Sequence, residues 1–312
     1  MERRLSASRL GLFVLTILVA ALVGFAVRNP APPDETVNLR STLAPTVPPS
    51  TPAPTSTGSS SPAPSSPSAV APVERVLLSG TTRTGATLRA LAGDCDSGGA
   101  VLERSLDGGQ NWATVTSPLP GLLRVRALSA TEAWLVGTDK DCNARFSRST
   151  DGGRTWKTKT ATTGAWHLLP LDASQLHAPR GNVDSPCAGG TETIDLAVTN
   201  DVTAAVLCQG GQVHVTRDSG ATWKKAGVVT GASALAFADL SVGFAAAPGR
   251  DSCNGTRVSQ TLNRGATWKA RGCVEGAADG VALAFLSKTV GLLTTVQDTW
   301  RTTDAGHTWV RL

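Results

Sequence analysis

The chain has 312 residues, 41% of them hydrophobic and 17% charged, so it can bury a sizeable core and is not globally disordered. Its formal net charge of +5 is spread out without a dense Lys/Arg cluster, which argues against nucleic-acid binding. The aromatic residues are eight Trp, six Phe and no Tyr, so no mechanism here can use a tyrosine nucleophile.

The chain opens with a basic head, residues 1–9, followed by an uncharged apolar run from Leu10 to Val27 that Arg28 ends. At about 1.5 Å per residue this run reaches about 27 Å, close to the thickness of the bilayer's hydrocarbon core. We predict a transmembrane signal anchor over residues 10–28, with a cytoplasmic N-terminus and the remainder extracytoplasmic. A cleaved signal peptide is the alternative, although no clean Ala-x-Ala site follows the run.

Residues 29–72 have a different composition, with 12 of the 18 Pro interleaved with Ser, Thr and Ala. Such a segment has too little apolar surface to offset the entropy lost on ordering. We expect a disordered stalk, which a Ser/Thr/Pro composition also makes a candidate for O-glycosylation. The predicted product is a single-pass protein of the cell membrane that carries its folded part, residues 73–312, outside the cytoplasm.

Residues 73–312 contain one pattern five times, Ser/Thr-x-Asp/Asn-x-Gly-x-Thr/Asn-Trp. An Asp or Asn side chain can accept hydrogen bonds from the backbone of a tight turn, Gly supplies the conformational freedom, and Trp can pack between sheets. We therefore interpret the repeated residues as structural. They are Asp107, Gly109, Trp112, Asp151, Gly153, Trp156, Asp218, Gly220, Trp223, Asn263, Gly265, Trp268, Asp304, Gly306 and Trp309.

This pattern resembles the Asp-box, or BNR repeat, of β-propellers such as sialidases, sortilin-type receptors and photosystem II assembly factors. The resemblance covers residues 73–312 and implies an all-β propeller of four-stranded blades, with each Asp-box in the turn between the third and fourth strands. Short β-rich runs with turn residues between them frame each copy, as in a propeller blade. The motif is specific for the fold and carries little information about function.

The spacing of the repeated Trp residues predicts the number of blades. The intervals are 44, 67, 45 and 41 residues, and the long one exceeds a single blade by about half. The additional segment, roughly residues 162–193, is either a degenerate blade without the motif or an insertion. We favour six blades with one degenerate over five blades with an insertion.

The six Cys are expected to form disulfides, because the domain is predicted to lie outside the cytoplasm. Cys95, Cys142 and Cys253 fall in predicted second-to-third-strand turns, Cys208 ends a second strand, and Cys273 is placed in a connection between blades. All six can then lie on the face opposite the repeated turns. Pairing neighbours predicts Cys95–Cys142, Cys187–Cys208 and Cys253–Cys273. No Cys/His spacing favours a metal site.

No catalytic, cofactor-binding or metal-binding residues are predicted. Sialidases with this repeat use a tyrosine nucleophile, which this chain lacks. His167, His177 and Arg180 lie in the irregular segment and form a candidate binding rim, while a degenerate blade with surface histidines is the plainer interpretation.

The hypothesis that follows is a membrane-anchored, extracytoplasmic propeller that acts as a non-catalytic binding or assembly module for a protein or glycan, with no cofactor. The alternative is a cell-wall or glycan hydrolase that uses two carboxylates of the propeller, since such residues need no fixed spacing in the sequence.

Overall fold

The computed structural model describes residues 75–81, 85–159, 162, 164–169, 172–187, 191–250, 252–278 and 280–312. The predicted head, anchor and stalk, residues 1–72, lie outside the described residues. Backbone contacts divide the chain into two units, Met1–Pro67 and Ser68–Leu312, and every described residue belongs to the second. None of the described segments forms a helix long and apolar enough to span a membrane.

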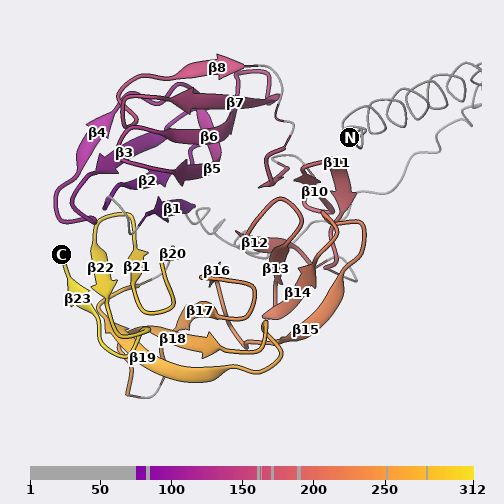
Figure 1. Ribbon diagram of the computed structural model, residues 1–312, viewed down its shortest axis with the longest axis vertical. Helices are drawn as coiled ribbons and strands as arrows, with labels where there is room; N and C mark the ends of the chain where they lie inside the picture. The colour runs from indigo at the N-terminus through magenta and orange to yellow at the C-terminus, as the bar shows by residue number, and fades with distance from the viewer. Residues whose placement is uncertain are drawn as a thin grey trace, which may run out of the picture. The chain divides into compact units, whose positions relative to one another are not determined.

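The described residues form six antiparallel sheets, which we number blades 1 to 6 in chain order (Figure 1). Blade 1 contains β1 (Val76–Gly80), β2 (Thr87–Leu91), β3 (Val101–Ser105) and β4 (Ala113–Val115); blade 2 contains β5 (Gly121–Ala127), β6 (Ala133–Thr138), β7 (Ala144–Ser149) and β8 (Lys157–Lys159). Blade 3 contains β9 (His167–Leu168), β10 (Gln175–Ala178) and β11 (Gly181–Asp184); blade 4 contains β12 (Thr193–Val198), β13 (Ala204–Cys208), β14 (Gln212–Thr216) and β15 (Lys224–Val228). Blade 5 contains β16 (Ala234–Phe237), β17 (Gly243–Pro248), β18 (Gly255–Thr261) and β19 (Lys269–Glu275); blade 6 contains β20 (Ala282–Phe285), β21 (Gly291–Thr294), β22 (Thr299–Thr302) and β23 (Val310–Arg311).

The six sheets form a β-propeller, as the sequence predicts. Each blade uses consecutive strands, and the first strand of each packs against the first strand of the next around a common axis. The ring is closed by contact between β20 of the last blade and β1 of the first. Blade 3 has only three described strands and lacks the repeated motif, so the long Trp interval corresponds to a degenerate blade.

The strands are apolar on both faces because each blade is sandwiched between two others. In β13 all five residues, AAVLC, are buried, and in β6 the neighbours Leu135 and Val136 are both 0% exposed. Successive side chains of a strand point to opposite faces, so Leu135 and Val136 pack toward different neighbouring blades. Continuous apolar runs of four to eight residues are what a strand buried on both faces requires.

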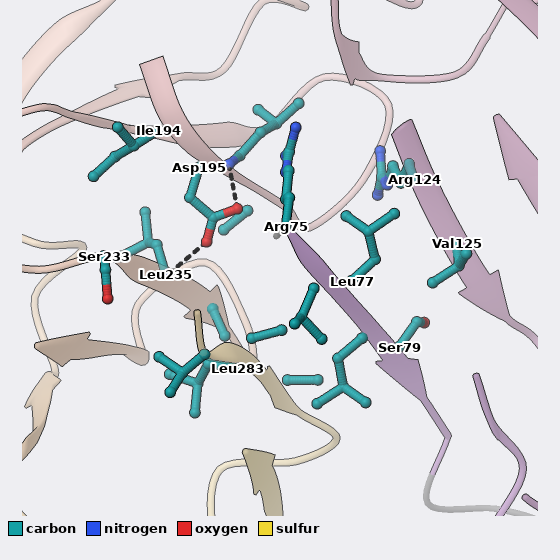
Figure 2. A pocket seen from close by; sticks show the side chains of 18 of the residues that line it. Arg75, Leu77, Ser79, Arg124, Val125, Ile194, Asp195, Ser233, Leu235 and Leu283 are labelled. Carbon is teal, nitrogen blue, oxygen red and sulfur yellow. Dashed lines mark hydrogen bonds between the residues drawn. The ribbon is translucent and has the colours of Figure 1, made fainter. Parts of the chain in front are cut away.

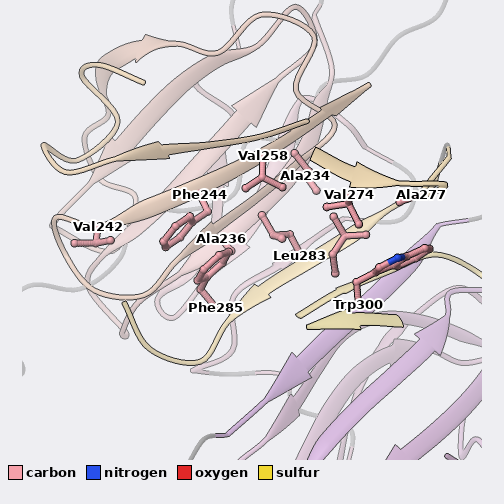
Figure 3. Close-up of a cluster of buried hydrophobic side chains, with 12 residues drawn as sticks. Ala234, Ala236, Val242, Phe244, Val258, Val274, Ala277, Leu283, Phe285 and Trp300 are labelled. Atoms are coloured by element: carbon pink, nitrogen blue, oxygen red, sulfur yellow. The ribbon is translucent and has the colours of Figure 1, made fainter. Parts of the chain in front are cut away.

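Buried hydrophobic clusters hold four of the six blade junctions. The largest joins blades 5 and 6, where Phe244 and Phe285 stack face to face beside Val258 and Leu293, and Trp300 is 4% exposed (Figure 3). Similar clusters join blades 1 and 2, blades 3 and 4, and blades 4 and 5. Among the described residues no such cluster spans the junction of blades 2 and 3 or that of blades 6 and 1.

The five repeated motifs, which we call the repeat turns, all lie between the third and fourth strands of a blade. In the turn of blade 6, Gly306 N donates to Thr302 Oγ1 over 3.0 Å and Thr308 N donates to Asp304 Oδ1 over 2.9 Å. The other four repeat turns make the same two bonds. The Asp or Asn side chain therefore satisfies the backbone of its own turn.

Each repeat turn is also tied to the rest of its blade. Ala305 N donates to Thr289 O, 2.9 Å away in the turn between β20 and β21. Ala305 and Gly306 have φ angles of 63° and 83°, a left-handed conformation that glycine adopts most easily. Trp309 folds back so that its Nε1 donates to Gly306 O over 3.1 Å and its ring meets Phe285 edge-on. The motif thus joins two turns and positions the Trp against the core.

The structure contains three disulfides, Cys95–Cys142, Cys187–Cys208 and Cys253–Cys273, the pairs that nearest-neighbour order predicts. The first joins blades 1 and 2, the second joins blades 3 and 4, and the third lies within blade 5. One detail of the prediction is wrong: Cys273 lies inside β19 and not in a connection between blades. The reason is that β19 extends to Glu275, because Gly255 and Thr256 of β18 pair with Glu275 and Val274.

Candidate functional site

A cavity of about 820 Å³ occupies the centre of the ring, lined by residues from the innermost strand of all six blades. A second cavity, of about 660 Å³, lies among blades 1 to 4 and includes the turn that carries Cys95. Arg75, which directly precedes β1, lines both cavities. The innermost strands meet only at the axis of a propeller, so residues from all six blades can contribute to one site there.

Three arginines line the central cavity. Arg75 precedes β1, and Arg124 and Arg126 alternate along β5, so both point to the same face of blade 2. In the β5–β6 ladder they pair with Val136 and Trp134, opposite the face that carries Val125 and its apolar cluster. The alternation of basic and apolar residues in β5 thus packs one face against blade 1 and leaves the other charged.

Arg75 and Arg124 are half-buried and Arg126 is exposed, but surrounding protein atoms displace water from all three guanidinium groups. This desolvation lowers the pKa of Arg75 and of Arg126, and it lowers the pKa of Arg124 to about 9, with a further contribution from the like charge of Arg126. Loss of hydration disfavours the charged form, and a nearby cation disfavours it further. An anion placed among these groups would therefore be strongly attracted.

The arginines differ in how their donors are used. Arg124 Nη1 donates to Trp166 O over 2.8 Å, and its guanidinium lies 5.2 Å from the ring centroid of Trp134. The guanidinium groups of Arg75 and Arg126 donate no hydrogen bond within the part of the chain that the structure describes. A guanidinium carries five N–H donors in a fork that matches a carboxylate or phosphate. The cavity thus offers donors suited to such a group.

Asp195 supplies a negative charge beside Arg75 (Figure 2). Its Oδ2 accepts from Leu235 N over 2.7 Å and its Oδ1 accepts from Leu196 N over 2.8 Å (Figure 2). Burial raises the pKa of this carboxyl, against the opposing effect of Arg75 and Arg124. Because one oxygen holds the backbone of blade 5 and the other its own strand, Asp195 joins β12 to β16.

Aliphatic side chains complete the wall of the cavity. Leu77, Leu235 and Leu283 line the cavity, and Leu235 lies beside Asp195, to which its backbone N donates (Figure 2). They come from β1, β16 and β20, which are far apart in the sequence. The cavity is therefore lined by both basic and apolar side chains, a combination that suits an anionic group attached to a larger ligand.

Two residues of the predicted binding rim, His167 and His177, lie together with their rings stacked. His167 is 1% exposed on β9 and borders the central cavity, His177 is half-buried on β10, and Arg180 is exposed in the β10–β11 turn. The alternative expectation of surface histidines is wrong for His167. Its side chain is enclosed because blade 3 packs between blades 2 and 4, a placement that the irregular sequence does not reveal.

The residues that the sequence analysis missed are Arg75, Arg124, Arg126 and Asp195. A usable signal was present, since Arg124 and Arg126 interrupt the apolar run GLLRVRA and Asp195 interrupts TIDLAV. Charged residues inside a strand that is otherwise apolar on both faces are candidates for an axial site. However, the alternation of polar and apolar residues does not identify them unless the number of blades and the closure of the propeller ring are known.

The repeat turns lie away from the central cavity. The carboxylate of Asp218 accepts hydrogen bonds from the side chain and backbone of Thr222 and from the side chain of Thr216. These bonds lower its pKa to about 2, and similar bonds lower the pKa of Asp304. These carboxylates are therefore ionised acceptors that stabilise turns.

Two groups of described residues are close enough to hold a metal ion, Cys95–Asp96–Cys142 and Cys253–Cys273–Glu275. In both of them the two sulfurs form a disulfide, so neither cysteine can act as a thiolate ligand. The residues present do not fit a metal at either place.

The fold and the cavity define a six-bladed β-propeller with a basic axial cavity. No family model matches the chain, and comparison with curated proteins gives no match. Among solved structures, a fucose-specific lectin from Aleuria aurantia is similar, with a TM-score of 0.50 at 11% identity, over 77% of this chain and 95% of the lectin.

Two other solved structures are similar at lower TM-scores. YCF48 from Cyanidioschyzon merolae has a TM-score of 0.43 at 17% identity, over 73% of this chain and 77% of YCF48. A GH74 xyloglucanase from Xanthomonas campestris has a TM-score of 0.32 at 18% identity, over 76% of this chain and 38% of the enzyme. At these identities the similarity concerns the fold alone.

Proposed function

We propose that the protein is a non-catalytic binding or assembly module that holds an anionic group of a protein or glycan partner in its central cavity. The observation that supports this most directly is the set of three arginines, Arg75, Arg124 and Arg126, around one cavity. Two of these guanidinium groups have no hydrogen-bond acceptor among the described residues. A carboxylate or phosphate would supply acceptors for both and offset the mutual repulsion of the cations.

The carboxylates of the cavity favour binding over hydrolysis. A two-carboxylate glycosidase needs one carboxyl group as an acid and another as a base or nucleophile. Asp195 and Glu192 line the cavity, but both oxygens of Asp195 already accept backbone N–H groups. Protonating Asp195 would weaken the link between β12 and β16, so we assign it a structural role.

We further propose that the five repeat turns are Asp-boxes and that the propeller is displayed outside the cytoplasm. The first proposal is supported by the shared pattern and by the same two turn hydrogen bonds in each copy. The second is supported by the apolar run of residues 10–27, the Pro-rich residues 29–72 and the three disulfides. On this proposal the stalk would allow the cavity to reach partners at a distance from the membrane.

The proposal is tested by affinity capture of partners from native membranes with the full-length protein. We expect a protein or glycan to be enriched with wild type and lost with the double variant Arg75→Gln/Arg126→Gln. The matched control is Lys157→Gln/Lys159→Gln, which removes the same charge from exposed positions on β8. Equal capture by both double variants, or no enriched partner with wild type, would contradict the proposal.

A further inference from the structure

The ring has two junctions of a different kind from the rest. Four junctions contain buried hydrophobic clusters, and two of these four are also crossed by a disulfide. Among the described residues, the junction of blades 6 and 1 and that of blades 2 and 3 have neither. Blades 1 and 2 therefore form one arc and blades 3 to 6 another, joined through two junctions that have no such cluster and no disulfide among the described residues.

At the junction of blades 6 and 1 the buried arginine has hydrogen-bond acceptors and a paired charge. Arg89 is 6% exposed and donates from its Nη1 to Thr299 Oγ1 and to Gln297 O, at 3.2 and 3.3 Å. Its Nε donates to Glu103 Oε2 over 2.7 Å, which neutralises its charge. This junction contains a paired cation with acceptors on both blades.

At the junction of blades 2 and 3 a buried polar atom is left without a hydrogen bond among the described residues. Arg124 donates to Trp166 O across it, and the rings of His167 and His177 stack there with centroids 4.5 Å apart. The Nδ1 atoms of both histidines lie within hydrogen-bond distance of Ala165 O, at 3.2 and 2.8 Å. A carbonyl can only accept, so each neutral ring donates from Nδ1 and carries its lone pair on Nε2. His167 Nε2 is buried and has no hydrogen-bond partner in the part of the chain that the structure describes.

Burial and the neighbouring groups on β5 and β10 disfavour a positive charge on His167, although the hydrogen bond to Ala165 O opposes this. Burial lowers the pKa of His167 to about 4, with contributions from His177 on β10 and Arg124 on β5. The third strand that contacts β9 is β12. It carries Asp195, whose negative charge favours the charged forms of Arg75 and Arg124. A proton on His167 Nε2 would leave a buried N–H donor without an acceptor beside other cations. In mild acid, above about pH 4, the group gains the proton mainly when the junction separates.

We infer that the junction of blades 2 and 3 is an acid-sensitive opening in the ring, controlled by protonation of His167 from solvent. At neutral pH the neutral imidazole of His167 stacks on His177 and the propeller ring is closed. As the pH falls below the pKa of an unperturbed imidazole, His167 takes up a proton in the open form. The closed form excludes this proton. Since Arg124 and His167 both border the central cavity, opening exposes that cavity along its side.

The test is hydrogen–deuterium exchange of the full-length protein at about pH 7 and about pH 5, with each rate corrected for the intrinsic rate. If the open form titrates as a free imidazole, opening should increase about twentyfold between these conditions. Protection should therefore fall by about this factor in peptides from β9 and β10. Peptides from β17 and β18 should keep their protection, because the junctions on both sides of blade 5 are apolar.

The His167→Gln variant should lose most of this pH-dependent change, because a glutamine does not titrate. The matched control is His214→Gln in blade 4, where burial also lowers the pKa of the imidazole; this variant should behave as wild type at β9 and β10. Unchanged protection at about pH 5, equal loss in all six blades, or a full response in His167→Gln would overturn the inference.

A second variant is available if His167→Gln does not fold. His177→Gln removes a like charge that contributes to the low pKa of His167, so the change in protection should be smaller than in wild type. A response equal to that of wild type in His177→Gln would count against the inference.

Discussion

Arg89 on β2 donates a hydrogen bond from Nη1 to Thr299 Oγ1 on β22, 3.2 Å away, joining residues 210 positions apart in the sequence. This contact lies where the last blade meets the first. In the described part of the chain no strand is shared between these two blades, since β1 to β4 and β20 to β23 are each continuous in sequence. The closure therefore depends on packing of β20 against β1 and on the bonds of Arg89.

Replacing Arg89 with Met should weaken this closure strongly. The substitution removes the donors to Thr299 and Gln297 and leaves Glu103 largely buried without its cation. Breaking a buried ion pair from one side typically costs about 3 to 5 kcal/mol, so we expect a loss of about 3 kcal/mol in the free energy of unfolding. Urea denaturation at neutral pH measures this.

The control for this prediction is Arg148→Met. Arg148 also pairs with a carboxylate, Glu132, but both side chains are about half exposed, at 55% and 46%. Exposed ion pairs contribute about 1 kcal/mol or less. Similar losses in the two variants would mean that Arg89 has no special role in closing the ring.

Substitutions at Ala305 and Gly306 should have opposite effects on stability. Both residues have a left-handed conformation, with φ of 63° and 83°. Ala305→Gly relieves the strain on an L-residue there and should raise the free energy of unfolding by about 0.5 kcal/mol. Gly306→Ala adds such strain and places a Cβ 3.4 Å from Val258, so it should lower stability by about 1 to 2 kcal/mol. Thermal unfolding of the two variants checks the signs, and two changes of the same sign would contradict this account of the turn.

Asp304→Asn should be tolerated far better than Asp304→Ala. The chain already uses an amide at the equivalent position, where Thr267 N donates to Asn263 Oδ1 and Asn263 Nδ2 donates to Thr267 Oγ1, both over 2.9 Å. We expect losses of about 1 kcal/mol or less for Asn and about 2 kcal/mol for Ala at pH 7, at roughly 1 kcal/mol per hydrogen bond.

The difference between wild type and Asp304→Asn should also depend on pH. Hydrogen bonds lower the pKa of Asp304 in the folded state. Its contribution is therefore complete above the pKa of the unfolded carboxyl, about 3.9, and is lost as the pH falls through the folded value. The advantage of wild type should shrink in strong acid. A constant difference from neutral to acidic pH would show that Asp304 is not a stabilised carboxylate.

The stability of the whole domain should fall on mild acidification because of His167. Its pKa is about 4 in the folded state, against about 6.5 for a free imidazole, so the unfolded chain takes up the proton first. Stability is complete above about pH 6.5 and falls by about 3 kcal/mol toward pH 4, where the loss levels off. Urea denaturation of wild type and His167→Gln across this range measures the effect, and parallel curves would contradict it.

The repeat made most of the fold predictable. The repeat turns depend on contacts within a few residues, as when Thr302 and Asp304 bond backbone groups only four positions away, so their pattern is visible in the sequence. The long interval between Trp156 and Trp223 likewise indicated a blade without the motif. Disulfide pairing was accessible because both cysteines of each pair lie in the same blade or in adjacent blades.

The central cavity was not predictable by the same reasoning. Arg75, Arg124 and Asp195 come together only because the innermost strands of blades 1, 2 and 4 converge at the axis. This convergence depends on the number of blades and on ring closure, which are long-range properties. His167 was singled out for its irregular surroundings, but its burial depends on blade 3 packing between its neighbours.

The most direct test of the proposed function is photo-crosslinking from the central cavity in native membranes. A photoreactive residue at Ser233, which is exposed and lines the cavity, should form a crosslink to a partner, and the same residue at Thr158 on the outer strand β8 should not. Arg75→Gln/Arg126→Gln should abolish the Ser233 crosslink. Crosslinking from Thr158 alone, or an undiminished Ser233 crosslink in the double variant, would contradict the assignment of the arginine-lined cavity as the binding site.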